Sequence, residues 1–184
     1  MNLRKVVKSV IPNAVFSKIE PAGHTLESML FAARYGFPAK NMKIIGVTGT
    51  NGKTTTCYMI HRMMVDAGYK TALLSTVANG VGDDITPQSF HMTTVSAPML
   101  NKRLKEFKDK GAEWVVLETT SHALAQGRVW GIPYQIAVLT NITHEHLDYH
   151  GTFLAYVKAK RKLFEIASGH KDGFAVINAD DPVR

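Results

Sequence analysis

A glycine- and threonine-rich segment with one lysine has the residue types needed to hold a phosphate group. Residues 48–55 read Thr-Gly-Thr-Asn-Gly-Lys-Thr-Thr and follow an apolar run that is typical of a buried strand. A turn from a strand into a helix aims several backbone N–H groups and the positive helix end at one point. Gly49 and Gly52 permit such a turn, Lys53 can reach the β- and γ-phosphates, and the Thr54 hydroxyl can ligate Mg²⁺.

This segment is a variant of the common phosphate-loop pattern, which has glycine where this chain has Val47. The alternative interpretation is a glycine-rich turn that happens to carry a lysine. The strand before it and the helix after it favour nucleotide binding. The predicted ATP-binding residues are Gly49, Thr50, Asn51, Gly52, Lys53, Thr54 and Thr55.

Further polar side chains follow two other apolar runs. Glu118 ends one run, and residues 141–150, which contain His144, His146 and His150, follow another. In open α/β sheets, ligands bind beyond the carboxyl ends of the strands. Glu118 and one imidazole beside a triphosphate would make a Mg²⁺ site, although a carboxylate in this position is also common on a protein surface.

The histidine-rich segment also permits a different metal site. His144-x-His146-x-Asp148-x-His150 is similar to the H-x-H-x-D-H pattern of metallo-β-lactamase-type hydrolases, which bind two metals. That pattern has its last histidine directly after the aspartate, where this chain has Tyr149. The interpretation also leaves the phosphate loop without a role, so we do not favour it.

Lys160 has an unusual place on its predicted helix, residues 152–168. At about 100° per residue, Lys160 falls within an apolar stripe. The stripe comprises Phe153, Val157, Phe164 and Ala167. An inward-facing lysine is costly when charged, and a neutral amine can react with CO₂ to give a carbamate, which is able to ligate Mg²⁺. The alternative is that the Lys160 side chain reaches past the stripe to solvent.

Strands and helices alternate from Met42 onward, which predicts the elements that position these side chains. The expected strands are 42–48, 71–77, 113–118, 134–140 and 173–178. The expected helices are 24–35, 97–110, 121–128 and 152–168, with a further helix that follows the glycine-rich turn and runs to Ala67. Residues 78–95 are expected to form a loop. Near-continuous apolar strands separated by helices predict an α/β fold with a mostly parallel, doubly wound sheet. Since the chain ends just after a strand, we expect this sheet to be incomplete.

Composition and charge exclude several classes of protein. The chain has 184 residues, of which 45% are hydrophobic and 20% charged, as in ordinary globular proteins. No apolar run approaches the roughly 20 residues that span a bilayer, and Cys57 alone excludes an internal disulfide. Residues 1–53 hold eight of the 22 Lys and Arg residues against two Glu, which favours an anionic partner such as a nucleotide or phosphosugar. Basic residues are not interleaved with aromatic ones, so nucleic acid is not favoured.

Four segments in order resemble the central ATPase domain of the Mur ligases. They are Thr48–Thr56, Glu118–Arg128, Asn141–Gly151 and Ile177–Asp181, and the resemblance runs from about Met42 to Pro182. Three threonines after the loop lysine and the segment His-Leu-Asp-Tyr-His-Gly are most similar to the MurE branch. The resemblance implies a short N-terminal segment, residues 1–41, in place of a UDP-binding domain. Residues 42–184 would be the N-terminal part of the central domain, with the C-terminal domain absent.

The resemblance implies an ATP-dependent amide ligase of peptidoglycan precursor synthesis in the bacterial cytoplasm. Such a ligase phosphorylates the carboxylate of UDP-MurNAc-L-Ala-D-Glu, and the amine of an incoming amino acid then attacks the acyl phosphate. The implied catalytic residues are Lys53, Lys160 and His146, and the implied Mg²⁺ ligands are Thr54, Glu118, His146 and carbamylated Lys160. The implied substrate-binding residues are Thr93, Thr94, Thr120, Gln126 and Arg128.

Two alternatives remain open at this point. A ligase similar to cyanophycin synthetase or to lipid-II-modifying enzymes would share the phosphate loop but take another substrate. The chain would otherwise be a module that binds Mg-ATP without catalysis. In either case we expect residues 1–184 alone not to complete a catalytic cycle.

Overall fold

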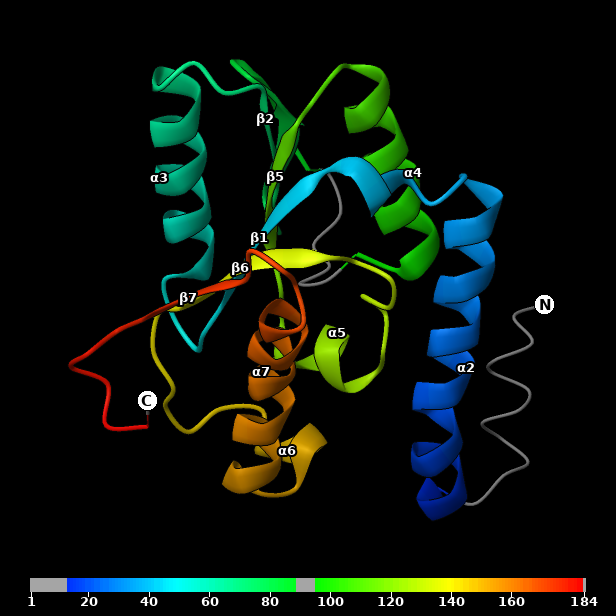
Figure 1. The fold of residues 1–184 in the computed structure, drawn as a ribbon. Helices are drawn as coiled ribbons and strands as arrows, with labels where there is room; N and C mark the ends of the chain where they lie inside the picture. The colour runs from blue at the N-terminus through cyan, green and yellow to red at the C-terminus, as the bar shows by residue number, and fades with distance from the viewer. Residues whose placement is uncertain (1–12, 89–94, 184) are drawn as a thin grey trace.

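A seven-stranded sheet forms the centre of the computed structural model, which describes residues 13–88 and 95–183 (Figure 1). The strands are β1 (Lys43–Thr48), β2 (Thr71–Leu74), β3 (Ala78–Val81), β4 (Asp84–Pro87), β5 (Trp114–Glu118), β6 (Tyr134–Leu139) and β7 (Phe174–Ile177). Their order across the sheet is β4-β3-β2-β5-β1-β6-β7. The pairs joining β2, β5, β1, β6 and β7 are parallel, whereas β3 pairs antiparallel with both neighbours. The predicted mostly parallel sheet is therefore confirmed.

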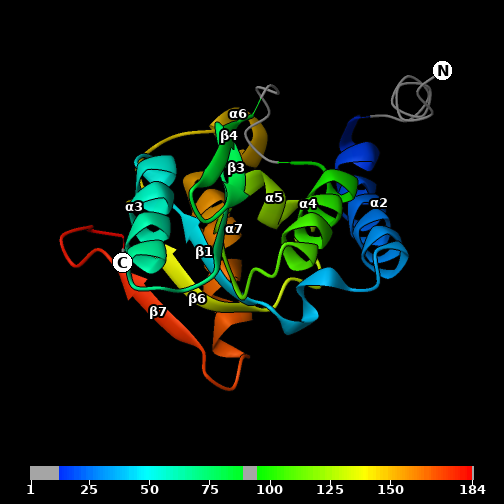
Figure 2. The same cartoon turned by 90° about the horizontal axis from the view of Figure 1, so that it is seen from above.

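Helices cover both faces of this sheet, as the doubly wound prediction requires (Figures 1 and 2). The helices are α2 (Asn13–Arg34), η1 (Pro38–Asn41), α3 (Lys53–Asp66), α4 (Ala97–Asp109), α5 (Ser121–Ala125), α6 (Leu147–His150) and α7 (Phe153–Ser168). α3 lies on one face, and α4, α5 and α7 lie on the other. None of the helices in the described part of the chain is long and apolar enough to span a bilayer.

The central strand β1 is buried on both faces, which explains its continuous apolar sequence. Ile44 belongs to the core cluster that contains Leu104 of α4 and Leu163 of α7. Val47 belongs to the cluster on the other face, with Cys57 of α3. Gly46 faces α7, and a Cβ atom there would lie 2.6 Å from Tyr134 and 2.7 Å from Leu163. The glycine therefore lets α7 approach β1 closely.

Two predictions about local structure are wrong. Residues 78–87 were expected to form a loop but form the antiparallel hairpin β3–β4. The hairpin turns at Gly82, whose φ of 61° favours glycine. The helix expected over residues 24–35 begins at Asn13 and includes Pro21.

The helix α2 packs beside α4 on the side of the molecule away from α3 (Figure 2). The Ser28 hydroxyl lies 3.1 Å from both the Gly127 and the Arg128 carbonyl oxygens, beyond α5. A Cβ atom at Gly127 would lie 2.2 Å from the Thr25 hydroxyl oxygen, so the two segments are in close contact. These contacts hold α2 against the layer of helices that carries α5.

We expect Gly46→Ala to destabilise the protein by about 1–3 kcal/mol, because the added methyl group overpacks the contact between β1 and α7. Chemical denaturation followed by circular dichroism measures the free energy of unfolding. Gly23→Ala is the control, since a Cβ atom at Gly23 has nothing within 4 Å and alanine favours the helix. Equal stabilities of the two variants would contradict the close approach at Gly46.

Candidate functional site

The phosphate loop connects β1 to α3 at the carboxyl edge of the sheet. Gly52, with φ of 79°, precedes the first residue of α3, so the free N–H groups of the helix start at the loop. Gly49 has φ of 153°, and a Cβ atom there would lie 1.8 Å from the Thr140 hydroxyl oxygen. Both glycines are therefore required by the loop conformation, and the predicted strand–loop–helix arrangement is confirmed.

The loop is held against the segment that follows β6. The Thr50 N–H donates to the Asn141 carbonyl at 2.8 Å, and the Asn51 N–H donates to the Asn141 side chain at 2.9 Å. The Thr140 hydroxyl donates to the Asn51 carbonyl at 2.7 Å. These hydrogen bonds hold the first half of the loop against the segment after β6.

Lys53 begins α3 and folds back over the loop. Its amine donates to the Thr50 carbonyl at 2.7 Å and to the Gly49 carbonyl at 3.1 Å. Carbonyl oxygens satisfy the ammonium group but do not neutralise its charge. A phosphate group at the loop would supply the anionic partner that Lys53 lacks in these two contacts.

Glu118 ends β5 beside the first turn of α3 and is 6% exposed. Its Oε2 atom accepts hydrogen bonds from the Thr54 hydroxyl at 3.0 Å and from both the N–H and the hydroxyl of Thr76 at 2.9 Å. A hydroxyl and a carboxylate oxygen side by side are the hard donors that Mg²⁺ prefers, so the residues present fit that ion. Thr76 was missed from the sequence, although it follows β2 at the same edge of the sheet.

Lys160 faces inward from α7 and is 2% exposed, so the prediction from helical periodicity is confirmed and the solvent-reaching alternative is wrong. Its amine donates to the Gly49 carbonyl at 2.6 Å and lies 4.5 Å from the centre of the Tyr156 ring. Burial, and then repulsion from Lys53, lower the pKa of Lys160 to about 7. An amine with this pKa is partly neutral near pH 7 and is able to act as a nucleophile.

A buried hydroxyl without a partner lies on the same side of the sheet. Thr48 Oγ1 is buried and has no hydrogen-bond partner among the described residues. Because side chains alternate along a strand, Thr48 faces the same way as Gly46, toward α7. A buried hydroxyl without a partner is costly, so a hydrogen-bonding group beside it would be favourable.

The imidazoles do not form a metal-binding group with the acidic side chains. Across residues 13–88 and 95–183, no three His, Cys, Asp or Glu side chains come together in a way that would hold a metal ion. The His144 ring stacks on Phe153 at 4.5 Å, and His150 Nε2 lies 3.0 Å from the Ser121 hydroxyl. The two-metal hydrolase interpretation is therefore wrong.

His146 joins a cluster of aromatic rings beside α7. It has φ of 55°, which is uncommon for a residue other than glycine. Its ring lies 4.7 Å from that of His122 and 6.3 Å from that of Tyr156. Burial, and then the nearby His122, lower the pKa of His150 to about 4. His146 therefore lies near α7, the helix that carries the buried Lys160. Its role as a Mg²⁺ ligand stays a prediction.

The residues predicted to hold the substrate fall into two groups. Thr93 and Thr94 lie outside the described residues. Thr120 caps the start of α5, its hydroxyl accepting from the Ala123 N–H at 3.3 Å, and Gln126 and Arg128 follow that helix. Three of the five predicted substrate-binding residues therefore lie next to α5. Their contact with a substrate stays a prediction.

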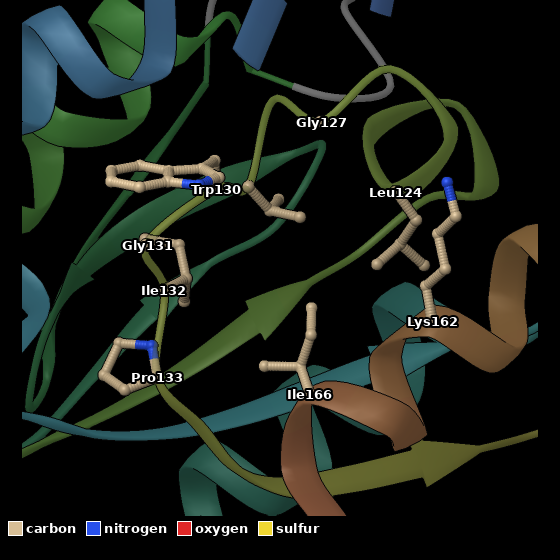
Figure 3. A pocket seen from close by; sticks show the side chains of 9 residues that line it. Leu124, Gly127, Trp130, Gly131, Ile132, Pro133, Lys162 and Ile166 are labelled. Atoms are coloured by element: carbon tan, nitrogen blue, oxygen red, sulfur yellow. The ribbon is translucent and has the colours of Figure 1, made fainter. Parts of the chain in front are cut away.

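Two apolar cavities lie near α7. The larger, of about 440 Å³, is next to the segment that leads into β6 (Figure 3). It is lined by Leu124, Gly127, Val129, Trp130, Gly131, Ile132, Pro133, Lys162 and Ile166. The smaller, of about 320 Å³, includes Lys160 in its lining. The smaller cavity therefore adjoins the buried amine.

The buried amine predicts a pH-dependent stability. The pKa of Lys160 in the folded protein is about 7, below its ordinary value of 10.5, so the unfolded chain binds more protons between these pH values and stability rises with pH. We expect Lys160→Met to be more stable than the parent protein at pH 6, and the difference in stability to be smaller at pH 9. Thermal unfolding in CO₂-free buffer measures this difference. The exposed Lys158, changed to Met, is the control. Parallel profiles for parent and Lys160→Met would contradict a buried, depressed amine.

The sequence of this chain is similar to those of known ligases. The chain is 43% identical, over 90% of its length, to UDP-N-acetylmuramoyl-L-alanyl-D-glutamate–2,6-diaminopimelate ligase of Geobacillus thermodenitrificans, and covers 34% of that protein. It is 44% identical, over 82% of its length, to the UDP-N-acetylmuramyl-tripeptide synthetase of Deinococcus radiodurans, of which it covers 30%. The chain thus spans about a third of the length of these relatives.

Solved structures show the same architecture. A structure of UDP-N-acetylmuramoyl-L-alanyl-D-glutamate–2,6-diaminopimelate ligase aligns with a TM-score of 0.70 and 34% identity, covering 89% of this chain and 32% of that one. A structure of E. coli FolC in complex with DHPP and ADP aligns with a TM-score of 0.66 and 21% identity, covering 83% and 46%, which shows likeness of fold. The family model described as the Mur ligase middle domain matches residues 47–184, and this chain therefore belongs to the Mur ligase family.

Proposed function

We propose that this chain is part of an ATP-dependent ligase that adds an amino acid to UDP-MurNAc-L-Ala-D-Glu in peptidoglycan precursor synthesis, in the bacterial cytoplasm. The observation that carries the proposal is the meeting of Lys53, the Thr54–Glu118 pair and the buried Lys160 at one phosphate loop. The names of the relatives supply the substrate class. Because the chain spans about a third of those relatives, the activity is proposed for the longer protein.

The proposed role of the loop is to hold ATP by its triphosphate. The N–H groups at the start of α3 face the phosphates, and Lys53 exchanges its carbonyl partners for the transferring phosphoryl group. Thr54 and Glu118 would hold Mg²⁺, and His146 and carbamylated Lys160 would provide further ligands. When bound, Mg²⁺ supplies positive charge that offsets the charge developing on the phosphate oxygens.

The proposed reaction then follows in two transfers. A carboxylate oxygen of the substrate attacks the γ-phosphorus, the bond to ADP breaks, and an acyl phosphate forms. The amino acid nitrogen attacks the acyl carbon, loses a proton, and expels phosphate to leave an amide. The proposed contacts to the UDP-linked substrate come from Thr93, Thr94, Thr120, Gln126 and Arg128. Positioning and charge neutralisation account for most of the catalysis in this scheme.

Nucleotide binding is the first experiment. We expect the 184-residue chain to bind Mg-ATP in isothermal titration calorimetry, and Lys53→Ala to weaken binding by about tenfold or more because a charge-assisted contact is lost. Lys162→Ala is the control, since this exposed lysine lies on the far side of α7 at the 440 Å³ cavity. Failure of the parent chain to bind ATP would overturn the proposed role of the loop.

Carbamylation of Lys160 is the second experiment. We expect ¹³CO₂ to give a carbamate carbon signal in NMR spectra of the chain, and Lys160→Ala to remove it while Lys158→Ala, on the exposed side of the same helix, keeps it. In the complete enzyme, Lys160→Ala should lose activity, and small carboxylates or bicarbonate should restore part of it. Unchanged activity of that variant would rule out a catalytic carbamate.

A further inference from the structure

Tyr156 lies where the phosphate loop, α7 and the segment after β6 meet. It is fully buried and stands one helical turn before Lys160 on α7. Its hydroxyl oxygen lies 2.9 Å from Thr50 Oγ1 in the phosphate loop. The Lys160 amine lies 4.5 Å from the centre of its ring. One side chain therefore contacts both the loop and the buried lysine.

The hydrogen bonds at Thr50 give the direction of this contact. The Thr50 hydroxyl accepts from the Thr143 N–H at 2.8 Å and donates to the Thr143 carbonyl at 3.3 Å. A hydroxyl has one proton and two acceptor positions. Since the Thr50 proton is used on Thr143, the Tyr156 hydroxyl donates to Thr50. This arrangement satisfies every group that meets at Thr50 Oγ1.

α7 reaches the phosphate loop through two side chains one turn apart. Lys160 donates to the Gly49 carbonyl, and Tyr156 donates to the hydroxyl of the next residue, Thr50. Conversion of the Lys160 amine to a carbamate, as proposed above, would take away its role as an ammonium donor to Gly49. The Tyr156 bond involves no ionised group and would persist.

We propose that Tyr156 is a positioning residue that holds the phosphate loop in place relative to Lys160. This role rests on the proposed nucleotide binding. Tyr156 acts through Thr50 rather than by touching ATP. Besides the bonds from the Lys53 and Lys160 amines, the hydrogen bonds described for the loop backbone come from the segment after β6, at Thr140 and Asn141. Tyr156 therefore supplies the uncharged link between the loop and the helix that carries the buried amine.

The test compares Tyr156→Phe with Tyr134→Phe. Tyr134 is equally buried, and its hydroxyl lies 3.0 Å from Thr119 Oγ1, a residue that does not belong to the phosphate loop. Each variant keeps its ring and loses one tyrosine–threonine hydrogen bond. Thermal unfolding should therefore show similar small losses of stability in the two variants. A difference between them in amide exchange or ATP affinity would then not reflect a general loss of stability.

Two measurements on the 184-residue chain decide the proposal. Hydrogen exchange of the Thr143 amide, without nucleotide, should be several-fold faster in Tyr156→Phe and unchanged in Tyr134→Phe. The dissociation constant for Mg-ATP should rise about threefold to tenfold in Tyr156→Phe alone, the size expected for one buried hydrogen bond. In a Thr50→Val background, Tyr156→Phe should cause no further loss, whereas Thr50→Ser should preserve the effect of Tyr156→Phe.

The outcomes separate this role from the proposed function. If the Thr143 amide exchanges at the same rate in Tyr156→Phe as in the control variant, the proposed positioning role of Tyr156 is overturned. Faster exchange with unchanged ATP affinity shows a structural contact only and overturns the positioning role. An additive loss in the Thr50→Val background also overturns it, because the effect would not pass through Thr50. A parent chain that binds no ATP overturns the proposed nucleotide binding of the loop and, with it, the positioning role.

Discussion

The carbonyl oxygen of Gly49 accepts hydrogen bonds from two lysine amines, at 3.1 Å from Lys53 and at 2.6 Å from Lys160. Two cations near one carbonyl repel each other, and burial makes the charge on Lys160 costly. The lowered pKa of Lys160 follows from both effects, with burial the larger. A site built in this way favours either an arriving anion, which offsets both charges, or the loss of a proton from the buried amine.

Close packing makes this convergence possible. Gly46 lacks a side chain, so Leu163 and the helix α7 pack directly against β1, and Lys160 then lies one turn further toward the carboxyl edge. Gly49 likewise leaves room for the Thr140 hydroxyl, which ties the loop to the segment after β6. The position of the buried amine relative to the loop thus depends on two glycines and on one helix-to-strand contact.

Most of the parallel sheet was predictable because its strands read as apolar runs between helices. The inner strands β1, β2 and β5 are largely buried, whereas the edge strand β7 is exposed and was still marked by its apolar sequence. The hairpin β3–β4 was not predictable, since Asn79, Gly80 and Pro87 are residues that favour turns. Pairing of β3 with β2 and with β4 decides their conformation, and the propensities of the single residues do not predict that pairing. The start of α2 was missed for a related reason, because Pro21 disfavours the interior of a helix.

The residues of the site likewise fall into those that the local sequence identifies and those that only contacts between distant segments identify. The glycine-rich sequence around Lys53 and the apolar stripe around Lys160 identify these two lysines, so each was predictable from its neighbours in the sequence. No such sequence signal identifies Thr76 or Tyr156, because a threonine after a strand and an aromatic residue on a helix are common. Only folding brings Thr76 to Glu118 and Tyr156 to Thr50. Sequence patterns therefore identify the groups able to do chemistry, whereas burial and second contacts, which set their pKa and position, arise from packing between distant segments.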